Sequence, residues 1–110
     1  MIYDGVDTIQ LRVDEELKKR IKMKAVEDDI TIQDEVEKAV ESFLKFAEET
    51  SRITFIPTLK SRGVLTGYRL RKNLHDKLKA VSERYAVSIR VTLYTALVHY
   101  FEKEGTSHVP

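Results

Sequence analysis

Apolar residues recur along the chain with the spacings that distinguish helices from strands. The strongest helical pattern follows Thr31, where apolar positions are separated by alternating steps of three and one and so line one stripe of a helix. Its members are Val36, Ala39, Val40, Phe43, Leu44 and Ala47. A second helix is predicted just before it, because Leu17, Ile21 and Ala25 repeat at a spacing of four.

A short segment with the period of a strand precedes both helices. Residues alternate between apolar and polar from Thr8 to Val13, so that each set occupies one face of a predicted strand. The apolar set is Ile9, Leu11 and Val13, and the polar set is Thr8, Gln10 and Arg12. Because a lone strand leaves its backbone N–H and C=O groups unpaired, we expect a second strand beside it.

The same order of patterns returns in the second half of the chain. Tyr68 and Leu70 alternate with polar residues in a second predicted strand, and two helical stripes follow it, beginning at Leu74 and Leu93. Moving the first half by 57 positions superposes apolar residues on apolar residues, as when Val40 falls on Leu97. This correspondence indicates an internal duplication.

Polar residues and a glycine predict where the helices begin and end. A side-chain oxygen just before a helix accepts a hydrogen bond from an N–H group in its first turn. The predicted caps are Asp14, Thr31, Asn73 and Ser88. The first helix should end near Glu27–Asp29, where acidic groups oppose its dipole, and Gly105 should end the last helix.

Residues 48–63 follow neither period and divide the chain into two units, 1–47 and 64–110. The partial alternation in Ser51–Pro57 allows at most an edge strand, because Pro57 has no N–H group to donate. Fully extended, this predicted linker would reach about 50 Å at roughly 3.3 Å per residue. That length is enough to cross a small domain.

A strand, a helix, a short turn and a second helix within about 40 residues resemble the ribbon-helix-helix (MetJ/Arc-like) family of DNA-binding proteins, and two such units are predicted here, Thr8–Ala47 and about Leu65–Glu104. The resemblance implies a mainly α fold with a two-stranded antiparallel β-ribbon. The two tandem units would form an intramolecular pseudo-dimer whose ribbon enters the major groove of double-stranded DNA. Such a tandem arrangement resembles small transcription regulators of archaeal viruses.

The resemblance also implies which residues contact DNA. Outward strand residues are expected to contact bases, namely Thr8, Gln10, Arg12, Gly67, Arg69 and Arg71. Residues at the start of each second helix are expected to contact phosphates, namely Thr31, Ile32, Gln33, Ser88, Ile89 and Arg90. Lys72 is expected to contact a phosphate through its charge. The chemistry suits these roles, because arginine pairs with guanine, glutamine pairs with adenine, and the free N–H groups of a helix start bind anions.

The predicted turns between helices depart from the family pattern. Family members often have a glycine there, whereas these turns contain none, and the first one carries Asp28 and Asp29. Both acids lie close to the predicted phosphate contacts around Thr31 and should weaken them.

Charge is unevenly distributed, although the net charge of the 110 residues is only +1. Residues 1–50 hold 14 acidic and 8 basic side chains, whereas residues 51–110 hold 4 acidic and 11 basic ones. The second half therefore has the basic character expected of a phosphate-binding surface, and the first half does not. Two solvated helical surfaces of opposite sign are the alternative interpretation.

Neither catalysis nor a cofactor is expected. The chain has no cysteine and no glycine-rich phosphate loop, and its three histidines lack the spacing of metal ligands. No apolar run approaches the roughly 20 residues of a membrane span, and the first residues do not resemble a signal peptide. We therefore expect no membrane partner and a cytoplasmic location, in the host cytoplasm if the protein is virus-encoded.

The sequence thus predicts a sequence-specific transcription regulator, such as a repressor, whose affinity for DNA falls with salt. Since the two units differ, one chain would favour an asymmetric half-site, and a homodimer of chains would cover a palindromic operator. Pairing between chains, with self-assembly along DNA, remains open. The alternative function is a protein-interaction module, an antitoxin or an assembly adaptor, on the same fold.

Overall fold

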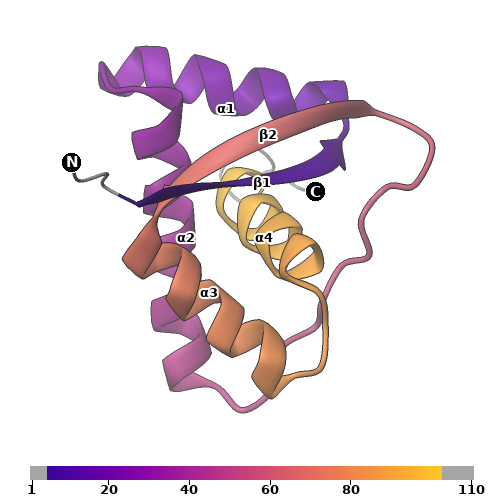
Figure 1. The fold of residues 1–110 in the computed structure, drawn as a ribbon. Coiled ribbons are helices and arrows are strands. Elements are labelled where there is room, and N and C mark those ends of the chain that lie inside the picture. Colours follow the sequence, from indigo (N-terminus) through magenta and orange to yellow (C-terminus); the bar gives the residue numbers. More distant parts are fainter. Residues whose placement is uncertain (1–4, 103–110) are drawn as a thin grey trace, which may run out of the picture.

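A two-stranded antiparallel ribbon lies across four helices in the computed structural model, which describes residues 5–102 (Figure 1). The elements follow in the order β1 (Val6–Val13), α1 (Glu15–Asp28), α2 (Ile32–Glu49), β2 (Val64–Arg71), α3 (Lys72–Arg84), α4 (Ile89–Leu97) and a short π-helical segment, η1 (Val98–Glu102). The sequence of strand, helix and helix therefore occurs twice. The prediction of a mainly helical chain with an antiparallel ribbon is confirmed.

The two strands of the ribbon belong to one chain and pair with each other over their whole length. Gln10 lies opposite Gly67, and the pairing extends from Val6 opposite Arg71 to Val13 opposite Val64. The alternating apolar side chains of both strands are buried, with exposed fractions of 4% or less. They are Ile9, Leu11, Val13, Tyr68 and Leu70, so the inward face of the ribbon is the predicted one.

The inward face of the ribbon covers a single hydrophobic core that both halves of the chain build. β1 packs on α4 and β2 on α2, and α2 also contacts α1, α3 and α4. At the centre of this core, Val36 and Val40 of α2 and Leu93 and Leu97 of α4 are fully buried. Burial of each such large side chain stabilises the fold by about 1.5–3 kcal/mol, against the conformational entropy of ordering it. Because each half supplies only part of the core, the two halves stabilise one another.

Three of the four predicted helix caps are confirmed. Asp14 accepts a hydrogen bond from the N–H group of Leu17 at 2.7 Å, and Thr31 and Ser88 form the equivalent bonds in α2 and α4 at 3.0 and 3.1 Å. The prediction for Asn73 is wrong. β2 leads directly into α3, so Asn73 already lies inside that helix and Arg71 takes the cap position without a capping side-chain bond.

The ends of the second helix of each half differ in detail from the prediction. α2 extends to Glu49, two residues into the predicted linker, whereas Ser51–Pro57 forms no strand, in agreement with its interpretation as a linker. Regular α4 ends at Leu97, after which η1 continues with a wider turn that keeps Phe101 buried in the core. The predicted stop at Gly105 lies outside the described residues. α1 ends at Asp28 as predicted, with Asp29 in the left-handed conformation.

Candidate nucleic-acid interface

The six residues predicted to contact bases all lie on the outward face of the ribbon. Antiparallel pairing sets Thr8 opposite Arg69, and Gln10 opposite Gly67, so the two polar sets share one surface. Five of the six are exposed, and Arg12 is half-buried. A seventh residue of this surface is Leu65 of β2, which lies opposite Arg12 and is 58% exposed. Leu65 was not predicted as a contact, although extending the alternation of β2 by one step toward the linker predicts it.

The three arginines of this face differ in their freedom to reach a ligand. Arg69 is exposed and makes no ion pair with any other residue of the described part. The guanidinium of Arg12 donates a hydrogen bond to the carbonyl oxygen of Gly63 at 3.2 Å. This hydrogen bond orients the Arg12 side chain. Because the bond is exposed at the surface, water or a base can replace the Gly63 carbonyl oxygen as the acceptor.

Arg71 is held at the edge of the ribbon by α2. Its guanidinium lies 3.1 Å from a carboxylate oxygen of Glu37, and its backbone N–H group donates to the other oxygen of the same carboxylate at 2.8 Å. Glu41 lies further away, at 3.9 Å. Because the Glu37 side chain is 6% exposed, this ion pair is better shielded from water than the other ion pairs of the surface. Base contact by Arg71 stays a prediction, and it would require this pair to open.

Each strand lies beside the start of one second helix, and a groove separates the two. Thr31, Ile32 and Gln33 at the start of α2 line a groove of about 340 Å³ with residues 67–69 of β2. At the start of α4, Arg90 lines a groove of about 240 Å³ with residues 10–12 of β1. The Nε group of Arg90 donates a hydrogen bond to the carbonyl oxygen of Gln10 at 2.8 Å. The predicted phosphate contacts thus flank the predicted base contacts at both ends of the ribbon.

The two helix starts differ in charge. The first turn of α2 carries Asp34 and Glu35, and the preceding turn carries Asp28 and Asp29. The first turn of α4 has no acidic residue and carries Arg90. Free N–H groups attract an anion at either start, but the carboxylates oppose it at α2. The start of α4 is therefore the more favourable site for a phosphate.

A pair of carboxyl groups lies behind the start of α2. Glu35 is fully buried, and neither of its oxygens accepts a hydrogen bond from a described donor. Burial raises the pKa of Glu35, and the neighbouring carboxyl group of Asp28 raises it further. Burial opposes ionisation of Asp28 as well, but its interactions with Glu35, Lys24 and Lys38 outweigh burial and lower its pKa.

Lys72, a predicted phosphate contact, lies apart from both grooves. It is the first residue of α3, and its ammonium group lies 3.5 Å from the carboxylate of Asp76 one turn later. Both side chains are mostly exposed, so the pair is weak and leaves Lys72 accessible. Lys72 could therefore contact only a phosphate that lies beyond the end of the ribbon where β1 begins and β2 ends.

Residues 5–102 contain no group of three or more His, Asp or Glu side chains arranged to hold a metal ion. None of the helices in this range combines the length and the apolar character that crossing a bilayer requires.

Comparison with known proteins identifies no relative, because no protein-family model, curated protein or solved structure matches the chain significantly.

Proposed function

We propose that the chain is a tandem ribbon-helix-helix protein that binds double-stranded DNA in a sequence-specific manner and regulates transcription. The observation that carries this proposal is the register of the ribbon. Gln10 faces Gly67, and these residues are separated by 57 positions, the offset at which the sequence repeats. An approximate two-fold axis through this residue pair then relates the two halves as a pseudo-dimer.

The two grooves beside the ribbon support the same relation. The groove at α2 pairs residues 31–33 with residues 67–69, and the groove at α4 pairs Arg90 with residues 10–12. Adding 57 to 33 gives 90, and subtracting 57 from 67–69 gives 10–12. Each strand therefore packs beside the helix start contributed by the other half, which is the exchange expected of two pseudo-symmetric units.

Recognition follows from the chemistry of the outward face. A two-stranded ribbon fits the major groove, where side chains reach base edges. Gln10 can form a bidentate pair with adenine, and the exposed Arg69 can form one with guanine. Leu65 offers an apolar contact for a thymine methyl group. Gly67 adds no side chain at the centre of the ribbon, so bases can approach the backbone closely there.

Phosphate contacts then fix the ribbon in the groove. The N–H groups in the first turn of α4 have no acceptor within the helix backbone and point toward its N-terminal end. Arg90 adds a positive charge beside them. α2 makes a weaker contact because of its acidic first turn. One chain would therefore bind an asymmetric half-site, and two chains would cover a palindromic operator.

The test is selection of bound fragments from random duplex DNA, followed by affinity measurements on selected and scrambled duplexes. Gln10→Ala together with Arg69→Ala should reduce the preference for the selected sequence by about 5- to 160-fold for each bidentate pair that is removed, equivalent to about 1–3 kcal/mol. Arg84→Ala is the matched control, since Arg84 is exposed in the last turn of α3, away from the ribbon. An unchanged preference in the double variant would contradict base reading by these residues.

One observation favours the alternative function, a protein-interaction module. α2 and α4, with η1, line a groove of about 510 Å³ to which the ribbon contributes no residue. Its rim includes Phe46, which is 38% exposed and whose ring lies 5.4 Å from that of His99. If the folded protein binds no duplex at low salt, this groove becomes the better candidate for the functional surface.

A further inference from the structure

The segment between α2 and β2 is fastened to the body of the protein. The backbone N–H group of Ile56 donates a hydrogen bond to the hydroxyl oxygen of Thr95 in α4 at 2.9 Å. The ring of Phe55 packs against those of Phe43 and Tyr85, with centroids 6.5 and 5.4 Å apart. A loose tether would have no such contacts, so this segment follows a defined path along α4.

The end of the segment is fixed against the ribbon. Gly63 has a φ of +79°, and a Cβ atom at this position would lie 2.5 Å from the carbonyl oxygen of Val13. The carbonyl oxygen of Gly63 also accepts the hydrogen bond from Arg12. Only glycine permits this approach, so the chain enters β2 from one direction. The residues just before Gly63 are therefore held beside the end of β1.

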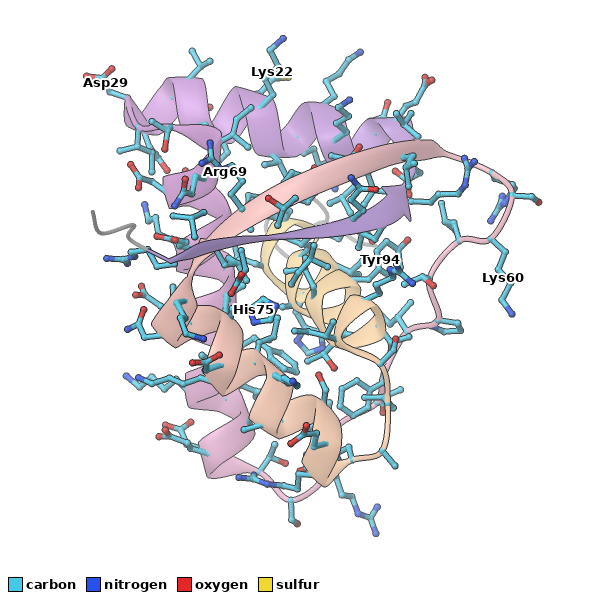
Figure 2. All side chains as sticks on the ribbon, in the orientation of Figure 1. Lys22, Asp29, Lys60, Arg69, His75 and Tyr94 are labelled. Carbon is cyan, nitrogen blue, oxygen red and sulfur yellow. The ribbon has the colours of Figure 1, made fainter. Side chains whose placement is uncertain are left out.

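This path places basic residues of the segment beside the candidate interface. Lys60, with its neighbours Thr58 and Leu59, lines the same groove as Arg12 and Arg90. Figure 2 shows Lys60 extending into solvent from this end of the molecule. The fourth cation, Arg62, is exposed two residues further on.

The surroundings of Tyr94 indicate where Arg62 lies. Burial raises the pKa of Tyr94, and the carboxylates of Asp14 and Glu102 add to this effect. Arg62 acts in the opposite sense on Tyr94. Its place in the chain agrees, because Arg62 directly precedes Gly63, which lies against the carbonyl group of Val13 at the end of β1. Asp14 is an acidic residue directly after β1, and its carboxylate already accepts the hydrogen bond that caps α1.

Within residues 5–102, the opposite end of the ribbon carries Arg71 and Lys72, but each of these cations is paired with a carboxylate, of Glu37 and Asp76 respectively. The groove there is lined only by the start of α2 and by residues 67–69, with Arg69 as its one basic residue. Asp28, Asp29 and Asp34 surround that helix start. Figure 2 shows Asp29 and Arg69 on the side of the molecule opposite Lys60. A polyanion that crosses both ends therefore meets very different potentials.

We propose that Lys60 and Arg62 bind backbone phosphates of the duplex DNA that extends past the ribbon on the side of the α4 start. Each chain then occupies its half-site in one orientation, and its contact with the DNA backbone extends further on that side. The inference rests on the proposed DNA binding and deepens it. The fixed path of the segment makes these contacts favourable, because fewer backbone torsions need to be ordered when DNA binds. The linker is then part of the binding surface as well as a connection between the halves.

The experiment compares the salt dependence of affinity for a selected duplex between the wild type and the double variant Lys60→Gln, Arg62→Gln. Removal of two phosphate contacts should reduce the slope of log K against log salt by about 1.8, at roughly 0.9 per contact. The matched control is Lys45→Gln with Lys77→Gln, because these lysines line a groove between α2 and α3. The control should keep the wild-type slope. Thermal unfolding should confirm that all variants fold.

Hydroxyl-radical footprinting on the same duplex tests the orientation. Wild-type protein should protect the sugar–phosphate backbone further on one side of the half-site, and the double variant should lose only that outer protection. A wild-type slope and footprint in the double variant would overturn this inference while leaving DNA binding intact. Absence of binding by the wild type at low salt would instead overturn the proposed function, and this inference with it.

Discussion

Tyr68 offers the sharpest test of how the ribbon is stabilised. It lies in β2 on the inward face, is 4% exposed, and its hydroxyl group is buried without a hydrogen-bond partner among the described residues. A buried hydroxyl without a partner costs about 1–3 kcal/mol. Tyr68→Phe removes this group and keeps the ring. We expect the variant to be more stable at pH 7 by about 1 kcal/mol, since removal of the oxygen leaves a small void.

The alkaline range adds a second, independent expectation. Burial raises the pKa of Tyr68 from 10.0 to about 12. The folded state then holds the phenolic proton more tightly than the unfolded state, so the associated stability is fully present below pH 10 and is lost as the pH rises to 12. Two pKa units correspond to about 2.7 kcal/mol. The stability advantage of Tyr68→Phe should therefore grow by about that amount between pH 9 and pH 12.

Urea unfolding followed by circular dichroism, at pH 7 and at steps from pH 9 to pH 12, measures both quantities. Lysines titrate in the same range, so the difference between variant and wild type is the informative value. Tyr85→Phe controls for removal of a phenol from a half-buried position. If Tyr68→Phe is destabilising at pH 7, the hydroxyl has a partner. A constant difference from pH 9 to pH 12 would refute the effect of burial on its ionisation.

Three further expectations concern the turns and the helix ends. Glu35→Gln should raise Tm at neutral pH by a few degrees, on the scale of about 4–8 °C per kcal/mol, because a buried glutamine carries no charge that burial disfavours. Burial raises the pKa of Glu35, so the folded state favours its protonated form, and the gain in Tm should shrink as the pH falls toward 4.5. Calorimetry at several pH values measures this change. Gly63→Ala should lower the free energy of unfolding in urea by at least about 1–3 kcal/mol, because of its positive φ and its clash with β1. Gly67→Ala, whose new Cβ atom would lie 3.1 Å from its nearest neighbour, should lower it clearly less. Equal losses would argue against the tight turn at Gly63. Asn73→Ala should change stability by less than about 0.5 kcal/mol, whereas Ser88→Ala should cost about 1 kcal/mol by the loss of its cap, and the reverse order would contradict the assignment of the α3 start.

Periodicity predicted most of the architecture because burial depends on which face a side chain occupies. Ile9, Leu11 and Val13 alternate, and a strand with that alternation has only one orientation that buries them. The stripe of α2 was equally informative, since its buried residues repeat at helical spacing. The pairing of β1 with β2 within one chain was one of two arrangements that these patterns allow.

The errors arose where contacts distant in sequence override local preference. Asn73 is a good cap by its chemistry, but Glu37 of α2 binds the backbone N–H group of Arg71 and so sets where β2 ends. The linker gave no periodic signal, since its path depends on Thr95 and on aromatic rings elsewhere in the chain. Lys60 was overlooked as an interface residue for the same reason, because only the folded path brings it beside Arg12.

The ribbon forms between two segments of the same polypeptide, and this has a consequence for concentration dependence. A surface assembled from two separate subunits disappears on dilution below their dissociation constant, whereas this one forms in a unimolecular reaction at any dilution. A few molecules per cell would each present a complete ribbon. Freed from the self-complementarity that identical subunits require, the two strands can also diverge, as Gln10 and its glycine partner already have.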